Sequence, residues 1–168
     1  MKKIFKIHPL TYIMILIAFL TGQFRFFFIF MLLIIVHELG HIISGLIFKW
    51  KLKEIIVLPL GMISKYDNLV NLSLNEEMLV ASMGVIFQLV FYMLFIKKYD
   101  YINNTIILFN LLPIIPLDGS KILNVLLNKI FSFKSSYMIS LYLSFIIISF
   151  IILLSIKIYG VIILISFR

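Results

Sequence analysis

Three ionisable residues lie close together within the long apolar run from Phe30 to Lys49. They are His37, Glu38 and His41, in the pattern His-Glu-x-x-His. On an α-helix, residues four positions apart share one face about one turn apart, so the two imidazoles could bind one tetrahedral metal ion. Zinc is the metal that this ligand set favours, and Glu38 beside it could take a proton from a water molecule. The pattern therefore predicts a hydrolytic zinc site on a helix.

The apolar surroundings make a purely structural role costly. An ionisable side chain at the centre of a membrane helix costs about 3 kcal/mol on insertion scales, so the default interpretation is a functional site that faces the protein interior. Two histidines could instead form hydrogen bonds between helices, as polar residues in membranes often do. Glu38 argues against that alternative, because an unpaired carboxylate at this depth would be destabilising.

A catalytic zinc ion usually has three protein ligands and one open position, so a third ligand must be found. The chain has no cysteine, which leaves histidine and the carboxylates. His8 lies at an expected membrane edge, and Asp67 and Asp100 lie in expected turns, where aspartate is common for backbone reasons. Asp118 also precedes a glycine, but it ends a segment broken by two prolines and expected to line the site. We therefore predict that Asp118 is the third ligand.

The composition is that of an integral membrane protein. Hydrophobic residues make up 63% of the 168 residues and charged residues 13%, whereas soluble domains are about half apolar and about a quarter charged. The net charge of +8 is scattered between apolar segments, and the absence of a basic patch argues against a nucleic-acid partner. We expect a single domain over residues 1–168, an all-α polytopic fold with roughly five or six transmembrane helices and a small membrane-associated β-hairpin.

Charged and turn-forming residues separate the expected spans. No small-residue cleavage site follows the first apolar segment, so we interpret it as an uncleaved span rather than a removed signal peptide. The fourth contains Pro113 and Pro116, which break a helix, and irregular backbone at membrane depth requires protein or a water-filled cavity around it. That segment should therefore line the site. The expected spans are 10–21, 26–48, 78–96, 101–117, 137–156 and a partial or tilted sixth at 158–167.

Two further segments are expected outside the spans. Residues 52–63 are too few to cross as a helix and are rich in β-branched residues, so they predict a strand. A turn signal at 66–68 and a short apolar run at 70–74 complete the hairpin. Residues 121–134 predict an interfacial helix or loop.

The distribution of lysine and arginine predicts the orientation. Basic residues cluster beside the N-terminus and after the second span, so the positive-inside rule predicts a cytoplasmic N-terminus. His41 lies about 12 Å along the helix from that second basic cluster. The site should therefore open toward the cytoplasm.

Four motifs together resemble one family. HELGH at 37–41, FNLLPIIPLDG at 109–119, KIHPL at 6–10 and LPLGMI at 58–63 resemble the site-2 intramembrane metalloproteases. The likeness is greatest to the bacterial sporulation branch, which processes a membrane-tethered sigma-factor precursor. It implies that His37, His41 and Asp118 bind zinc and that Glu38 is the general base. It also implies a multi-pass protein of the bacterial cell membrane, with a membrane-tethered substrate and regulatory membrane proteins as partners.

The resemblance implies two further roles. Asn110, in an Asn-x-x-Pro context, would hold the substrate backbone or an oxyanion, and its structural alternative is a hydrogen bond between helices. Residues 52–63 resemble the family's membrane hairpin, whose edge could pair with an unwound substrate strand.

The chain departs from the family pattern at two places. Residues 84–88 read Gly-Val-Ile-Phe-Gln where the family tends to have Ala-Gly-Pro, so the local geometry there should differ. The sequence ends at Arg168, whereas members of the sporulation branch usually carry a nucleotide-sensing CBS domain. Regulation by ATP is therefore not implied.

The sequence thus predicts a zinc-dependent endopeptidase that cleaves in or near a transmembrane segment of a tethered substrate. The alternative is a non-proteolytic membrane protein, such as a metal transporter or a pseudoprotease, and a third interpretation is a structural subunit. A transporter should carry ionisable residues along a path on several spans, whereas here the polar groups converge at one depth. A structural subunit leaves Glu38 and Asp118 unexplained.

Overall fold

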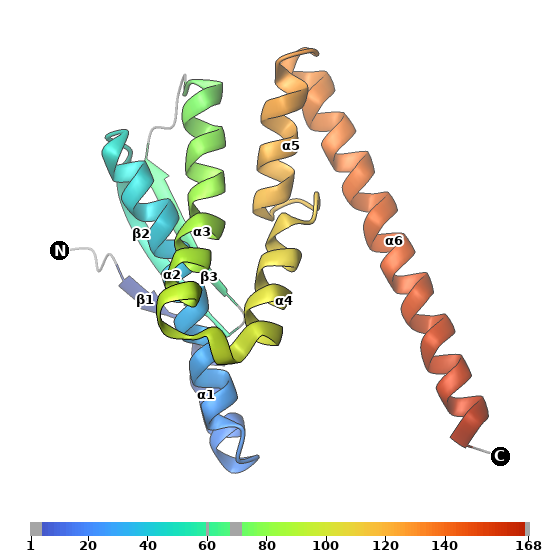
Figure 1. Cartoon of the computed structure of the whole chain (residues 1–168). Helices are drawn as coiled ribbons and strands as arrows, with labels where there is room; N and C mark the ends of the chain where they lie inside the picture. Colours follow the sequence, from blue (N-terminus) through green and yellow to red (C-terminus); the bar gives the residue numbers. More distant parts are fainter. Residues whose placement is uncertain (1–4, 60, 68–71, 167–168) are drawn as a thin grey trace. The chain divides into compact units, whose positions relative to one another are not determined.

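The structure is a computed structural model that describes residues 5–59, 61–67 and 72–166, with side chains described as far as residue 158 (Figure 1). Its residues pack into two compact units, 1–110 and 111–168. Each unit is described by itself, and the single domain over residues 1–168 stays a prediction. The described part is mostly helical with one small sheet, which confirms the predicted class of a helical membrane protein with a small β-element.

The helices of the first unit begin at residues suited to helix starts. They are α1 (Pro9–Leu20), α2 (Phe24–Ile47), α3 (Leu74–Phe95), the short 3₁₀ turn η1 (Lys97–Tyr99) and α4 (Asp100–Leu111). His8 caps α1 by accepting a hydrogen bond from the Leu10 N–H, 3.3 Å away, and Pro9 follows at the first helical position. The Ser73 hydroxyl caps α3, whose first turn contains Glu76 and Glu77. The first three helices confirm the positions expected at 10–21, 26–48 and 78–96.

A three-stranded sheet completes the first unit. Its strands are β1 (Phe5–Ile7), β2 (Lys51–Leu58) and β3 (Gly61–Asp67), in the order β1-β2-β3. β1 is parallel to β2, and β2 is antiparallel to β3 with Ile56 opposite Ile63. The presence of a hairpin is confirmed, but the first strand expected over 52–63 ends at Leu58, and residues 61–63 belong to β3. β1 was not predicted, because three residues carry too little pattern to identify a strand.

The predicted position of the second hairpin strand was wrong. Tyr66 and Asp67, expected in the turn, lie in β3, and the chain turns at Pro59 instead. Pro59 has no N–H for a ladder hydrogen bond, which favours a turn there. The strand expected at 70–74 falls partly on residues 70 and 71, outside the described residues, and Leu74 begins α3.

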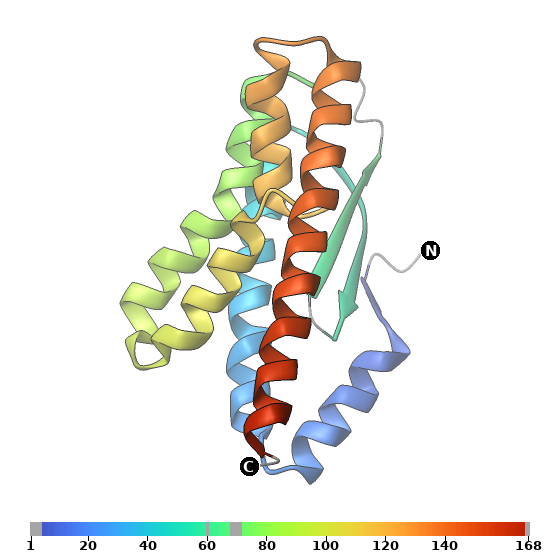
Figure 2. The ribbon, with the colours of Figure 1, turned by 90° about the vertical axis from the view of Figure 1, so that its right-hand side faces the viewer.

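The helices of the first unit pack around α2. A buried cluster joins α2 to α4 and consists of Ile29, Leu33, Ile34, Ile102 and Ile106. α3 lies alongside α2 in both views (Figures 1 and 2). A Cβ atom at Gly40 of α2 would overlap the backbone carbonyl group of Met83 of α3, so glycine allows the two helix backbones to touch.

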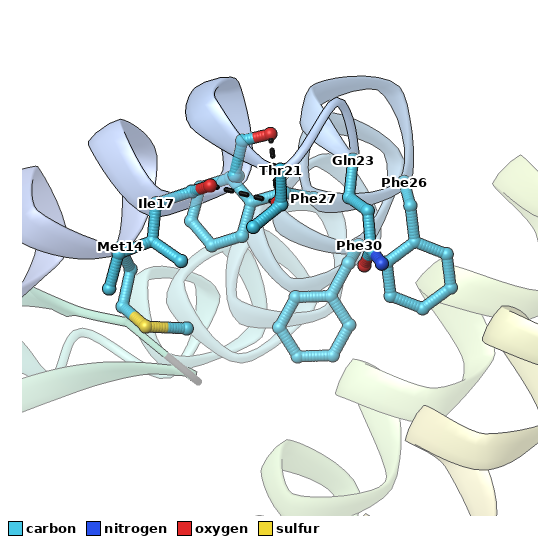
Figure 3. Close-up of a pocket in the computed structure, with 8 residues that line it drawn as sticks. Met14, Ile17, Thr21, Gln23, Phe26, Phe27 and Phe30 are labelled. Carbon is cyan, nitrogen blue, oxygen red and sulfur yellow. Dashed lines mark hydrogen bonds between the residues drawn. The ribbon is translucent and has the colours of Figure 1, made fainter.

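A mainly apolar pocket of about 230 Å³ lies where α1 turns back into α2 (Figure 3). The Thr21 hydroxyl donates to the Ile17 carbonyl oxygen, 2.8 Å away, so this polar group is satisfied within the turn. The lining residues lie between Met14 and Phe30, and none of the predicted metal ligands is among them.

The second unit consists of α5 (Asp118–Asn128) and α6 (Phe133–Ser166). Residues 112–117 are not helical, as the two prolines predicted, so the segment expected at 101–117 is helical only as far as Leu111. Ser144 of α6 supports this irregular backbone, because its hydroxyl oxygen accepts the Ile115 N–H at 3.0 Å. The helix or loop expected at 121–134 is helical as far as Asn128 in α5, while its last two residues, Phe133 and Lys134, already belong to α6. Its interfacial position stays a prediction.

α6 is one continuous helix of 34 residues. A separate sixth segment was expected at 158–167. This prediction is wrong for residues up to Ser166, which continue α6, and Phe167 lies outside the described residues. Lys157 interrupts the apolar pattern but not the helix, because lysine is a good helix former.

Three helices of the described residues are long and apolar enough to cross a bilayer. They are α2, α3 and the Phe133–Ile158 part of α6. α1 is apolar but has only 12 residues, or about 18 Å at the helical rise, against about 30 Å of hydrocarbon. The total of five or six spans stays a prediction.

Candidate metal centre

The two histidines of the motif meet on one face of α2. His37 and His41 are both buried, and their Nε2 atoms lie 3.1 Å apart. Two imidazole nitrogens bound to one tetrahedral zinc ion lie about 3.3 Å apart at normal Zn–N distances. The distance between the two Nε2 atoms in α2 is therefore close to the distance expected between two ligand atoms of one zinc ion.

The partners of the other ring nitrogens determine which nitrogen carries the proton. His41 Nδ1 lies 2.7 Å from the Val80 carbonyl oxygen, which can only accept, so Nδ1 carries the hydrogen. His37 Nδ1 lies 3.0 Å from Gln88 Oε1. In neutral rings both Nε2 atoms are then acceptors that point to one place. Two acceptors so close together suit a cation between them.

Glycine at position 84 leaves space beside these nitrogens. A Cβ atom built at Gly84 of α3 would lie 2.7 Å from His37 Nε2 and would also overlap the His41 ring. Any larger residue would fill the place beside both donor atoms. Two buried imidazole nitrogens and a space held open by glycine fit a zinc ion.

The departure from the family pattern at 84–88 leaves α3 uninterrupted. The helix continues from Leu74 to Phe95 through residues 84–88, the stretch that lacks the family's proline. One face of α3 then presents three features to the histidines: the Val80 carbonyl, Gly84 and the Gln88 side chain. These residues are four apart in sequence, as one helical face requires.

Glu38 is buried beside the histidines and is contacted by the sheet. The Ser64 hydroxyl of β3 donates a short hydrogen bond to Glu38 Oε1. Tyr66, two residues further on the same face of β3, donates to the His41 carbonyl oxygen at 3.3 Å. Burial, together with the negative charge of Glu38, raises the pKa of Tyr66 to about 12, so its phenol stays a donor at neutral pH. β3 thus positions the predicted base.

Asp118 lies in the second unit as the first residue of α5. It is buried, and Lys121 one turn later forms an ion pair with its Oδ1 at 2.8 Å. A Cβ atom at Gly119 would lie 2.6 Å from the Leu112 carbonyl oxygen, so close backbone packing requires the glycine that follows Asp118. The role of Asp118 as third ligand stays a prediction.

Asn110 ends the first unit within the last turn of α4. Its Nδ2 donates to the Ile106 carbonyl oxygen of the same helix, 3.0 Å away, and not to another helix. Its role toward a substrate also stays a prediction.

The rival ligand candidates have structural partners. His8 caps α1, Asp67 forms an ion pair with Lys53 at 2.8 Å, and Asp100 accepts a hydrogen bond from the Tyr92 hydroxyl. Asp67 lies at the end of β3 rather than in the expected turn.

The sequence interpretation missed Ser64, Gln88 and Asn103. Ser64 was hidden because the second hairpin strand was placed too far along the chain. Gln88 carried a visible signal, since it is an uncharged polar residue in the middle of an apolar span, where such residues usually contact another polar group.

The chain is similar to known proteins in sequence and in fold. No family model matches the chain. The chain is 30% identical over 153 residues to Stage IV sporulation protein FB of Bacillus subtilis (strain 168), a match that covers 80% of this chain and 51% of that protein. The chain thus spans about half the length of this curated relative. The Site-2 Protease from Methanocaldococcus jannaschii has a similar fold, with a TM-score of 0.61 at 19% identity over 80% of this chain and 71% of that one. The family resemblance predicted from the motifs is confirmed: this chain is a relative of Stage IV sporulation protein FB and has the fold of a site-2 protease.

Proposed function

We propose that this protein is a zinc-dependent intramembrane endopeptidase that hydrolyses a peptide bond in or near a transmembrane segment of a membrane-tethered protein. The observation that carries the proposal is the convergence of His37 and His41 Nε2 beside Gly84, next to the buried carboxylate of Glu38. The relationship to Stage IV sporulation protein FB supports it. In this proposal the protein lies in a bacterial cell membrane with its N-terminus and the site toward the cytoplasm.

His37, His41 and Asp118 would hold the zinc ion. Bound zinc would lower the pKa of a coordinated water molecule to about 7 and polarise the scissile carbonyl group. Asp118 is the favoured third ligand because it is buried, whereas Asp67 and Asp100 are exposed and Glu54 is only half-buried.

Glu38 would act as the general base and later as the general acid. Its carboxylate would accept a proton from the attacking water and deliver it to the leaving amine. The Ser64 hydrogen bond holds Oε1 and so restricts the rotation of the carboxylate.

A substrate would bind to the sheet in extended form. A peptide bond within a helix is shielded by its own turns, so the substrate must unwind locally. β2 lies between β1 and β3 in the described sheet. β3, the strand that contains Ser64 and Tyr66, is therefore an edge strand of that sheet. An unwound segment could add to this edge as a further strand, with backbone hydrogen bonds replacing those lost from the helix. Asn110 would hold the substrate backbone or the oxyanion.

Metal analysis with an Asp118→Ala variant tests the zinc part of the proposal. We expect about one zinc per wild-type chain after purification in detergent, and loss of tightly bound zinc in Asp118→Ala, because two imidazoles alone bind zinc weakly. Asp67→Asn is the control and should keep its zinc. Zinc that is retained equally in Asp118→Ala and in wild type would contradict the ligand assignment.

The Ser64→Ala variant tests the contact between β3 and the base. We expect about tenfold slower cleavage with unchanged zinc content, because a hydrogen bond to a charged group is worth about 1.5–3 kcal/mol and only part of it acts on the base. Ser155→Ala is the control, since the Ser155 hydroxyl donates only to the Ile151 carbonyl of its own helix, 2.8 Å away. The measurement is the cleaved fraction of a co-expressed tethered substrate, and an unchanged fraction in Ser64→Ala would remove Ser64 from the site.

A further inference from the structure

Two amide side chains are completely buried in the first unit, next to the histidines. Gln88 of α3 and Asn103 of α4 are both 0% exposed. Amide groups in an apolar helix bundle are destabilising unless hydrogen bonds satisfy them. The hydrogen-bond partners of these two amide groups therefore indicate their role.

The partners form one chain of hydrogen bonds that ends on His37. Gln88 Nε2 lies 3.1 Å from Asn103 Oδ1 and 3.3 Å from the Asn103 backbone oxygen. Gln88 Oε1 lies 3.0 Å from His37 Nδ1. At the other end, Asn103 Nδ2 donates to Asn104 Oδ1 at 3.3 Å. The chain thus runs from α4 through α3 to α2.

The backbone oxygen of Asn103 fixes the direction of this chain. A carbonyl oxygen can only accept, so the NH₂ group of Gln88 must face Asn103 and its oxygen must face His37. The proton of a neutral His37 ring is then held at Nδ1. Nε2, the nitrogen that faces His41, is then the ring nitrogen whose lone pair could bind a metal.

His41 differs from His37 in this respect. Its Nδ1 donates to a backbone oxygen, that of Val80, which no substitution at position 80 removes. His37 depends on a side chain for the same constraint. The tautomer and ring orientation of His37 are therefore controlled by the residue at position 88.

We propose that Gln88, held in turn by Asn103, is a positioning residue that fixes His37 as an Nε2 metal ligand. The inference rests on the proposed zinc site. Groups that hydrogen-bond to a metal-bound histidine orient the ring and raise its basicity, and their loss typically lowers metal affinity 10- to 100-fold. A structural glutamine that only joins α3 to α4 would not show this dependence.

Zinc affinity in Gln88 variants tests the proposal. The full chain is purified in detergent, and a chelator of known affinity competes for added Zn²⁺. Gln88→Met keeps the length of the side chain but its thioether sulfur is only a weak hydrogen-bond acceptor, and we expect 10- to 100-fold weaker zinc binding. Gln88→Glu keeps an acceptor facing His37 Nδ1, and we expect wild-type affinity within about threefold, or tighter. This rescue separates a positioning role from a packing role.

Thr11→Val is the matched control. The Thr11 hydroxyl is buried and donates to the Val57 carbonyl oxygen at 3.1 Å, so the variant also loses a buried hydrogen bond, but one away from the histidines. Its zinc affinity should equal that of wild type. Equal affinity of Gln88→Met and wild type, or equal loss in Gln88→Met and Gln88→Glu, would overturn the proposal.

A second measurement applies even if the Gln88→Met protein does not fold. The chain has three histidines, so ¹⁵N-labelled histidine in the metal-free wild-type protein gives a simple ring spectrum, and His8→Gln reduces it to the two buried rings. Both should carry their proton on Nδ1, and an Nε2–H tautomer at His37 would overturn the inference. A wild-type protein without affinity for zinc would overturn the proposed function and the inference together, whereas tight zinc binding with no effect of position 88 would overturn the inference alone.

Discussion

The Glu38→Gln variant is expected to bind zinc like the wild-type protein and to cleave its substrate at least about 1,000-fold more slowly. Glutamine has nearly the same shape, and its amide oxygen can still accept the hydrogen bond from Ser64. It cannot take a proton at neutral pH, and loss of general acid–base catalysis typically costs 10²- to 10⁴-fold. The fold and the metal site should therefore persist while the chemistry stops.

The measurement is a comparison of membrane proteins from cells that carry wild type or Glu38→Gln. An anchored protein should accumulate uncleaved in the variant and be shortened in the wild type, which would also identify the substrate. Glu76→Gln, the same chemical change in the first turn of α3, is the control and should cost only a few tenths of a kcal/mol of stability. Wild-type cleavage by Glu38→Gln would exclude it as the base. A zinc-bound wild type that leaves every anchored protein intact would favour the pseudoprotease or transporter alternative.

The metal-ligand face of α2 could be predicted from the sequence because helical periodicity is local. Residues four apart lie on one face whatever surrounds the helix, so His37 and His41 had to meet once the helix was identified. The break after Leu111 could be predicted for the same reason, since proline acts on its own backbone.

Long-range pairing could not be predicted in this way. Asp67 is a poor strand former and indicated a turn, but in the fold it lies at the end of β3, where the Lys53 ammonium across the hairpin pairs with it. That compensation is invisible until the register of the strands is known. The contact of Ser64 with Glu38 depends on the same register and was missed with it.

The support of His37 depends on the packing of three helices. Gln88 is conspicuous in an apolar span, but its partner Asn103 lies on α4 and its target on α2. Sequence spacing within one helix contains no information on which residue of another helix lies opposite. A lone polar residue in a membrane helix can thus be flagged from the sequence, while its role needs the fold.

A single methyl group at position 84 is expected to prevent zinc binding. In Gly84→Ala the new Cβ would lie 2.7 Å from His37 Nε2 and would overlap the His41 ring, so neither ring could keep its position. A movement of α3 away from α2 would relieve the overlap only by giving up the close backbone packing of Met83 on Gly40. We expect at least about a 100-fold loss of zinc affinity in the chelator competition, comparable with the strongest losses seen when a metal-ligating histidine is no longer held in place.

The helix itself should tolerate this change, which makes the result informative. Alanine favours a helix over glycine by about 1 kcal/mol, so a loss of zinc without a loss of helical signal would place the defect at the ring nitrogens. Gly61→Ala is the matched control, since a Cβ there meets nothing within 4 Å, and its zinc affinity should not change. If Gly84→Ala bound zinc as tightly as wild type, the metal could not lie beside both Nε2 atoms, and the hydrolytic site built on them would have to be abandoned.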